Sequence, residues 1–266
     1  MNILDTIVEE KYREVKEKKE LFPIKLLEKS LFFENKNISI KEYILRDDKF
    51  GIIAEFKRKS PSKGMINEYA SVEKVSIGYM QAGASALSIL TDEKFFGGSM
   101  NDLTTARKFN FCPILRKDFI IDEYQIIEAK SIGADAILLI ASILEPNRVL
   151  SLAKFAKSLG LEILLELHEQ EELGHINQFV DLVGVNNRNL KDFSVDINKS
   201  IQMAQSIPNE FVKIAESGIS SIDNLLEFKS NGFNGFLIGE RFMNSSQPEI
   251  ACKNFISDLK IALQII

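Results

Sequence analysis

Eight short apolar runs recur along the chain, and each one ends in charged or polar residues. Stretches with helical periodicity separate them, for example Ser71–Ala84, Asp122–Ala134 and Glu145–Leu159. This alternation predicts an α/β fold of the (β/α)₈ TIM barrel class, in which the chemistry takes place at the carboxyl ends of the strands. The polar ends of the runs are therefore the candidate site. The predicted strands are Phe50–Lys57, Ala86–Asp92, Pro113–Phe119, Ala136–Ser142, Glu162–His168, Leu182–Arg188, Phe211–Ser217 and Gly235–Glu240.

Residues 1–49 stand outside this repeat and predict an N-terminal helical extension. We expect a single domain over residues 1–266, with the barrel at residues 50–266. Pro23 breaks the extension, and Ile24–Leu31 can form a second helix. An amphipathic helix packs its apolar stripe on another surface, and the sequence leaves open whether the extension closes one end of the barrel or covers the site. The stripe consists of Leu4, Ile7, Val8, Tyr12 and Val15.

Composition narrows the possible partners and location. The net charge is −5 and the basic residues form no stripe, which argues against a nucleic-acid ligand. The N-terminal segment is too charged for a signal peptide and no apolar run approaches the length of a membrane span, so we expect a cytoplasmic protein without membrane contact. Cys112 and Cys252 form no motif, and we expect both thiols to be buried and reduced. We also expect a monomer.

Charged residues fall on one face of the predicted strands. Because strand side chains alternate, Glu55 and Lys57 share a face with Ile53, and Lys117 shares one with Leu115. Interleaved carboxylates and cations keep each other ionised and tune each other's pKa, which suits general acid–base catalysis. Any one of them alone would more often be a solvated rim residue, but six charges in register on five strands are difficult to explain in that way. The set on this face is Glu55, Lys57, Lys117, Glu166, Asn186, Arg188 and Glu216.

The last two predicted strands end in Ser217–Gly218 and Gly239–Glu240. Loops at this position of TIM barrels commonly bind phosphate through backbone N–H groups, and together with the basic loop 58–64 they indicate a phosphorylated small-molecule substrate. The loop Phe95–Gly98 either supplies aromatic surface to a ligand or packs beneath itself, and we expect His168 to serve packing. Neither histidine has a second ligand at metal spacing and no dinucleotide or Walker motif is present, so we expect no metal and no cofactor.

Five segments carry a specific combination of residues. They are 53–64 (IAEFKRKSPSKG), 115–122 (LRKDFIID), 164–168 (LLELH), 184–190 (GVNNRNL) and 215–219 (AESGI). Together they closely resemble the indole-3-glycerol-phosphate synthase family, and the resemblance extends over nearly the whole chain, including the helical extension. It implies a barrel that converts 1-(2-carboxyphenylamino)-1-deoxyribulose 5-phosphate into indole-3-glycerol phosphate, CO₂ and water in tryptophan biosynthesis, without a metal or organic cofactor.

The resemblance also implies roles for individual residues. Lys117 would be the general acid at the substrate carbonyl. Glu166 would be the base for the dehydration that follows, with Glu55 beside it, and Lys57 would bind the anionic substrate and share in proton transfer. The residues implied to hold the substrate are Ser60, Phe119, Asn186, Arg188 and Glu216, and those implied to frame its phosphate are Ser217, Gly218, Gly239 and Glu240.

Two features depart from the family pattern. Arg241 and Phe242 stand where small or aliphatic residues are expected, so the loop on the phosphate side is predicted to pack differently. The chain has no tryptophan, so a contact that some relatives make with one must come from an aliphatic or phenylalanine side chain. Two alternatives remain: another TIM-barrel enzyme that handles phosphosugars, such as an isomerase or a Schiff-base aldolase, and a non-catalytic barrel that binds a phosphorylated ligand.

Overall fold

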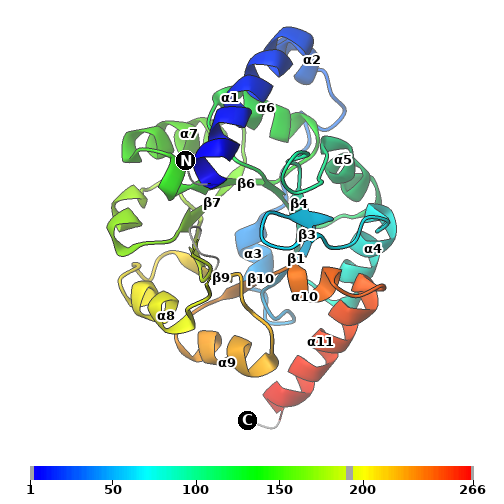
Figure 1. The fold of residues 1–266 in the computed structure, drawn as a ribbon, viewed down its shortest axis with the longest axis vertical. Coiled ribbons are helices and arrows are strands. Elements are labelled where there is room, and N and C mark those ends of the chain that lie inside the picture. Colours follow the sequence, from blue (N-terminus) through cyan, green and yellow to red (C-terminus); the bar gives the residue numbers. More distant parts are fainter. Residues whose placement is uncertain (1–2, 190–193, 265–266) are drawn as a thin grey trace.

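The computed structural model describes residues 3–189 and 194–264, and Leu190, the last residue of the segment 184–190, lies outside them. Within the described residues, parallel strands close into an eight-stranded barrel in which β1 pairs with both β4 and β10. Each predicted run contains one of these strands, so the predicted (β/α)₈ barrel is confirmed (Figure 1). The strands are β1 (Ile52–Phe56), β4 (Ala86–Leu90), β5 (Ile114–Lys117), β6 (Ala136–Ile140), β7 (Glu162–Leu167), β8 (Leu182–Asn186), β9 (Val212–Glu216) and β10 (Gly235–Ile238).

Helices cover the outside of the barrel (Figure 1). Side chains of Ser71, Ser99 and Asp122 fix where three of them begin, because each accepts a hydrogen bond from a backbone N–H of the first turn. The predicted helical stretches are confirmed as α4, α6 and α7. This layer contains α4 (Val72–Ala82), α5 (Met100–Phe109), α6 (Glu123–Ser131), α7 (Pro146–Ser158), α8 (Ile197–Gln205), α9 (Ile222–Ser230), α10 (Glu240–Met243) and α11 (Pro248–Gln264), with 3₁₀ turns η1 (Ala141–Ile143) and η2 (Gln170–His175). None of the described helices is long and apolar enough to cross a bilayer.

The two faces of the barrel strands bury different side chains. Ile53 and Leu115 pack together inside the barrel, whereas Ile52 and Ala54 pack in the layer between strands and helices. The inner face is therefore the one that was predicted to carry the charged residues. The short helix α3 (Ile40–Ile44) closes the amino-terminal end of the barrel, because both of its terminal isoleucines are buried in the inner cluster.

The predicted N-terminal helix is confirmed as α1 (Ile3–Leu21), but its buried face differs from the predicted stripe. Ile7 and Val15 are buried as expected, whereas Tyr12 is 64% exposed and Lys11 is fully buried. Positions four residues apart share a helix face, which places Lys11 between Ile7 and Val15 on the inner side. The prediction was wrong at Tyr12 because it assumed an apolar surface beneath the helix, and part of that surface is acidic.

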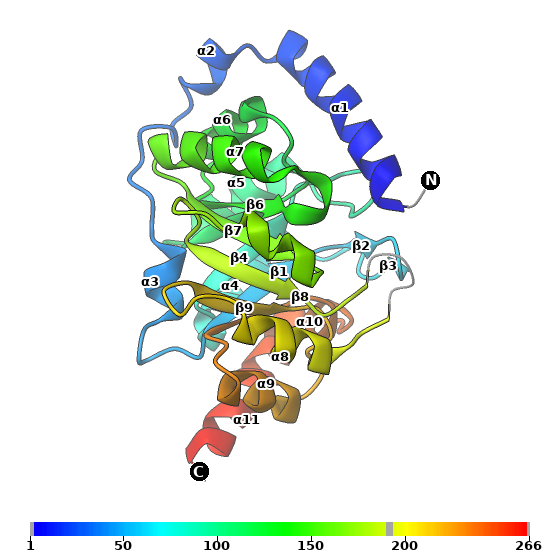
Figure 2. The same cartoon turned by 90° about the vertical axis from the view of Figure 1, so that its left-hand side faces the viewer.

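The second predicted helix is confirmed as α2, but it is short and spans only Ile24–Leu27 of the segment Ile24–Leu31. Beyond it the backbone N–H groups of Lys29 and Ser30 bond to carbonyls three residues back, which tightens the turn. The hydroxyl of Ser30 donates to the carbonyl of Ser131 at 2.7 Å and fixes this turn on α6. Figure 2 shows α1 on the side of the barrel that carries the hairpin of β2 (Lys59–Ser60) and β3 (Gly64–Met65), with α3 on the opposite side. The extension therefore does both things that the sequence left open.

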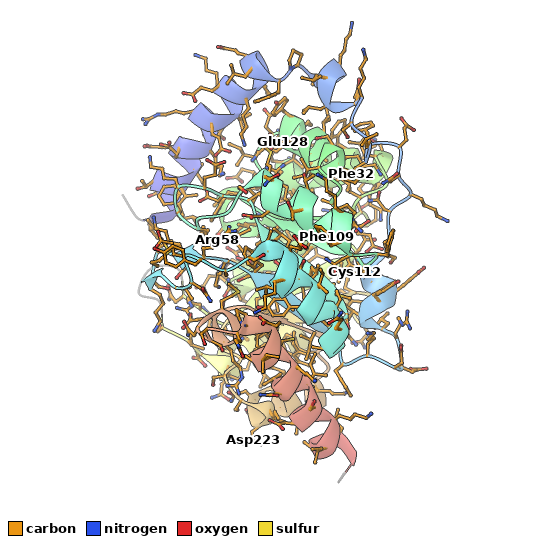
Figure 3. All side chains as sticks on the ribbon, turned by 90° about the vertical axis from the view of Figure 1, so that its right-hand side faces the viewer. Phe32, Arg58, Phe109, Cys112, Glu128 and Asp223 are labelled. Atoms are coloured by element: carbon orange, nitrogen blue, oxygen red, sulfur yellow. The ribbon has the colours of Figure 1, made fainter. Side chains whose placement is uncertain are left out.

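A buried ion-pair network attaches α1 to the barrel. Nζ of Lys11 lies 3.0 Å from Oδ2 of Asp92 and 2.9 Å from Oδ1 of Asp118, which follow β4 and β5. Asp118 also pairs with Arg116 at 3.1 Å, and Arg116 reaches Glu128 of α6 at 2.6 Å. Figure 3 labels Glu128 on this helix. Burial alone would lower the pKa of Lys11, but Asp118 and Asp92 outweigh it and raise the pKa. The ammonium group therefore stays charged when the helix is docked.

The network predicts that two lysine substitutions in α1 lower the free energy of unfolding by very different amounts. Lys11→Met keeps the stem of the side chain but leaves Asp92 buried without its lysine and Asp118 with Arg116 alone, so we expect the free energy of unfolding to fall by about 3–5 kcal/mol. Lys19→Met is the matched control, since the side chain of Lys19 is 46% exposed where it pairs with Asp122, and such a pair contributes about 0–1 kcal/mol. Urea unfolding followed by circular dichroism measures both. Equal losses of unfolding free energy in the two variants would contradict the stabilising role given to the buried ion pairs of Lys11.

Candidate active site

A cavity of about 480 Å³ opens at the carboxyl ends of the barrel strands. Every predicted site residue except Glu216 lines it. Glu216 is buried and contacts Lys117 instead. The predicted residues that line the cavity are Glu55, Lys57, Ser60, Lys117, Phe119, Glu166, Asn186, Arg188, Ser217, Gly218, Gly239 and Glu240.

Lys117 is the centre of the charged group in this cavity. Its Nζ lies 3.2 Å from Oε2 of Glu166 and also contacts Oε2 of Glu216. Nδ2 of Asn186 donates a hydrogen bond to Oε1 of Glu166 at 3.2 Å. Four strands, β5, β7, β8 and β9, deliver these side chains from their carboxyl ends. Parallel pairing and the alternation of side chains thus bring together residues that are far apart in the sequence.

The two glutamates of this group have opposite pKa shifts. Burial is the largest single effect and raises the pKa of both, but at Glu166 the charge of Lys117 and the contacts with His168 and Glu216 together outweigh it and hold the pKa well below its usual range. At Glu216 burial is larger than the effect of Lys117, and the nearby Glu166 carboxylate adds to it, which raises the pKa to about 8. Burial would lower the pKa of Lys117, but Glu216 and Glu166 raise it. At neutral pH the group therefore holds one protonated lysine, one ionised glutamate and one protonated glutamate.

Two glycines make room for buried carboxylates. A Cβ atom on Gly184 of β8 would overlap Oε1 of Glu216, and a Cβ atom on Gly239 would overlap Oε1 of Glu55. Glycine is therefore required at both positions for these carboxylates to stay where they are. Gly239 was predicted only as a phosphate-binding residue, and the space that it leaves for Glu55 is a second reason for a glycine there.

Glu55 and Lys57 form a second pair at the end of β1. Nζ of Lys57 lies 2.7 Å from Oε1 of Glu55. Burial would raise the pKa of Glu55, but Lys57 and Lys117 outweigh it and lower the pKa. The pair therefore places a second charged cation and an ionised carboxylate in the same cavity.

The predicted phosphate-binding residues lie together beyond β9 and β10. Ser217 and Gly218 have φ angles of 64° and 70°, so the chain makes a sharp left-handed turn there. The guanidinium group of Arg188 faces this corner, where it lies 3.1 Å from Oε2 of Glu240 and 3.3 Å from Oγ of Ser62. An anion in this corner meets a guanidinium group and the backbone of a tight turn, both of which suit phosphate.

The departure at Arg241 and Phe242 has a structural explanation. Phe242 is fully buried, with its ring 5.7 Å from that of Tyr79 and 5.8 Å from that of Phe255. The guanidinium carbon of Arg241 lies 4.9 Å from the centre of the Phe255 ring, and the group donates to the carbonyl of Ser220. Arg241 also lines the cavity, so the departure adds a cation to the rim.

The aromatic loop after β4 both packs and supplies surface to the cavity. Phe96 lines the cavity, and its ring lies 5.9 Å from that of Phe119. Oδ1 of Asp92 accepts the backbone N–H groups of Phe95 and Phe96 at 2.7 and 3.1 Å, which fixes the shape of the loop. The packing alternative is therefore confirmed, and contact of Phe96 with a ligand stays a prediction.

Aliphatic side chains complete the wall of the cavity. Ile3, Leu4 and Ile7 of α1 line it, so the contact expected in place of a tryptophan is aliphatic. Leu138 and Ile140 of β6 also line it, and these two were not predicted. The signal was available, because both fall on the inner face of a predicted strand.

His168 packs in the protein as expected, but it has a polar contact that the sequence reasoning missed. The residue is 8% exposed and does not line the cavity. Its Nε2 nevertheless lies 3.2 Å from Oε1 of Glu166. The available signal was its position two residues after Glu166, which places both on one side of the strand.

Comparisons with known proteins agree with this geometry. The family model described as indole-3-glycerol phosphate synthase matches residues 4–255. A protein of that name from Bacteroides thetaiotaomicron is 47% identical over 259 residues, which cover 97% of this chain and 99% of the relative. Another from Campylobacter jejuni is 40% identical over 256 residues, covering 94% of this chain and 98% of the relative. A third, from Caldanaerobacter subterraneus, is 40% identical over 262 residues, covering 97% and 99%.

A solved structure also supports the barrel fold. Thiamine phosphate pyrophosphorylase from Pyrococcus furiosus superposes with a TM-score of 0.59 at 16% identity, covering 81% of this chain and 98% of that one. This likeness concerns the barrel alone. The family model and the relatives, in contrast, match nearly the whole length of the chain. The chain therefore belongs to the indole-3-glycerol phosphate synthase family.

Proposed function

We propose that this protein, a carbon–carbon lyase of tryptophan biosynthesis, works by general acid–base catalysis in the mouth of its barrel. It converts 1-(2-carboxyphenylamino)-1-deoxy-D-ribulose 5-phosphate into indole-3-glycerol phosphate, CO₂ and water. The observation that supports this most directly is the buried group of Lys117, Glu166 and Glu216, in which one ammonium contacts two carboxyl groups. The direct test is to add the substrate to the purified protein and to follow the appearance of indole fluorescence.

Ring closure requires an acid. The aromatic carbon that bears the carboxylate attacks the ketone carbon, and the ketone oxygen must gain a proton as the carbon–carbon bond forms. Lys117 supplies this proton, because neighbouring carboxyl groups raise its pKa and keep it protonated. Loss of CO₂ then returns its bonding electron pair to the ring.

Dehydration requires a base and a cation for the leaving hydroxyl group. Glu166, with its lowered pKa, is ionised at neutral pH and takes the carbon-bound proton as the new ring becomes aromatic. Lys57 is the cation that protonates the leaving hydroxyl group, and Glu55 orients it through their 2.7 Å contact. The 3.2 Å contact between Glu166 and Lys117 gives the abstracted proton a path back to the acid for the next turnover.

The substrate has an aromatic end and a phosphate end, and the cavity has matching walls. The corner that receives the phosphate is framed by Ser217, Gly218, Gly239 and Glu240, and Arg188 faces it from β8. The aliphatic face of α1, with Phe96 and Phe119, receives the aromatic ring. Asn186, Ser60 and Glu216 act on the substrate between these ends, Glu216 through Lys117.

An aldolase that forms a Schiff base is disfavoured by the environment of Lys117. Such an enzyme needs a neutral amine as nucleophile, which other enzymes obtain by lowering the pKa of the lysine. Here the pKa is raised by the two glutamates. Borohydride treatment in the presence of substrate should therefore leave the protein without a covalent adduct.

We also propose that the protein is a cytoplasmic monomer that binds neither nucleic acid nor membranes. The net charge of −5 disfavours polyanions, and Cys112 and Cys252 are buried free thiols, as predicted. Size-exclusion chromatography with light scattering tests the oligomeric state.

Lys117→Ala should leave the protein folded and reduce kcat about 10²–10⁴-fold, because the variant lacks the general acid. Lys154→Ala, at an exposed position of α7, is the control and should leave kcat unchanged. Indole fluorescence gives the rate and circular dichroism the folded state. A folded Lys117→Ala protein that kept more than about a tenth of the wild-type turnover would overturn the assignment.

The opposite pKa shifts predict different results for the two glutamates. Glu166→Gln removes the base and should lower kcat about 10²–10⁴-fold with little change in KM. Glu216→Gln imitates a group that is protonated below pH about 8, so it should act mainly on KM near neutral pH.

The raised pKa of Glu216 also predicts how kcat depends on pH. In the wild-type protein kcat should decline above pH about 8, since ionised Glu216 makes Lys117 a weaker acid, and Glu216→Gln should abolish the decline. Steady-state kinetics of both variants between about pH 6 and pH 9 test these roles. The roles would be rejected if Glu216→Gln lowered kcat while Glu166→Gln changed mainly KM.

Gly184→Ala tests whether the position of Glu216 matters. The added methyl group overlaps Oε1 of Glu216 and displaces the carboxyl group from Lys117, so kcat should fall about 10-fold or more. Gly174→Ala is the control, because no atom lies within 4 Å of its added Cβ. Unchanged kinetics in a folded Gly184→Ala protein would show that the contact between Glu216 and Lys117 is dispensable.

A further inference from the structure

His168 is a buried titratable group that the reaction described above does not use. It follows β7 and is 8% exposed, and its ring does not line the cavity. Nε2 of the ring lies 3.2 Å from Oε1 of Glu166, the oxygen that also accepts the hydrogen bond from Asn186. The other oxygen of Glu166 contacts Lys117. The proposed base is therefore surrounded by three groups that favour its ionised form.

The backbone of His168 is held in place by the turn that follows it. Its N–H donates to Oε2 of Glu172 at 2.5 Å, and the same oxygen accepts the N–H of Glu169 at 3.2 Å. Within the described part of the chain, both ring nitrogens are buried and neither makes a hydrogen bond of good geometry, so the 3.2 Å approach of Nε2 to Oε1 of Glu166 is a close polar contact. The carboxylate that lies 3.2 Å from Nε2 favours the tautomer that carries its proton on this nitrogen.

The charges around the ring are negative. Glu166 of β7, Glu172 of η2 and Glu216 of β9 face it. Burial alone would lower the pKa of His168, but Glu166, followed by Glu172 and Glu216, raises it overall. His175 offers a contrast, because its two ring nitrogens lie 2.9 Å from the carbonyl oxygens of Glu172 and Leu144.

We propose that His168 is a positioning residue, whose Nε2–H holds the Glu166 carboxylate in place and keeps it ionised for its work as the base. The inference rests on the proposed function, in which Glu166 takes a proton during dehydration. His168 acts from outside the cavity and touches no substrate. Its contribution is to limit the movement of the carboxylate and to add a donor to Oε1, as the outer partners of catalytic groups commonly do.

Kinetics separate this role from simple packing. His168→Leu should lower kcat about 10–100-fold, with KM within about twofold, and should move the acidic limb of the kcat profile up by about one pH unit, because Glu166 loses a donor to its ionised form. His168→Gln restores an N–H donor at a similar reach and should recover most of kcat. His175→Leu is the matched control and should leave the acidic limb where it is. Unchanged kcat and pH profile in His168→Leu, or no recovery in His168→Gln, would overturn the proposal.

A second measurement does not depend on turnover. The chain has only two histidines, so ring ¹⁵N signals are assigned by comparing the wild type with His175→Gln. Glu166→Gln should lower the pKa of His168 by about one unit or more. An unchanged His168 pKa would overturn the pairing, including in the case that His168→Leu fails to fold. A lowered pKa in a protein that does not close the indole ring would support the pairing while rejecting the proposed function.

Discussion

The ammonium group of Lys117, held between two buried carboxyl groups, is the interaction on which the site depends. A lone charge at this depth would be driven to neutralise, so the position is stable as a cation only because Glu166 and Glu216 lie beside it. The barrel makes this possible because parallel strands end at one rim, where side chains from separate strands converge. Gly184 belongs to the same arrangement, since any side chain there would occupy the place of Glu216.

The same physical rule joins the extension to the barrel. Lys11 is buried in α1 and stays charged because Asp92 and Asp118 face it. Asp92 also holds the loop that brings Phe96 to the cavity, and Asp118 precedes Phe119, whose ring packs on Phe96. One buried cation therefore fixes a covering helix and the aromatic wall together. For this reason, substitution of Lys11 is expected to displace the aromatic wall of the cavity as well as to lower the stability of the protein.

The sequence predicted the strands and the inner face of the barrel because the period of two depends only on local geometry. It could not predict the inner face of α1, where Lys11 replaces Tyr12, because that choice depends on aspartates about 80 and 107 positions further on that only the fold brings near. It could not predict where α2 ends either, because the turn that follows the helix is held by a contact between Ser30 and Ser131, a residue about 100 positions further on. The roles of the site residues came from the family resemblance, while the contact of His168 with Glu166 was hidden in a position that looked like ordinary packing.

Two glutamates with identical side chains reach opposite protonation states in this cavity. Glu166 has Lys117 and Asn186 as hydrogen-bond donors and His168 in contact, whereas Oε1 of Glu216 accepts no hydrogen bond from the described residues. Each donor favours the ionised form, so the proton settles on the carboxyl group that has fewer of them. Residue type alone therefore does not decide which group is the base. The number and charge of the neighbours decide it, and those neighbours are set by strand register and by the glycine that leaves room for Glu216.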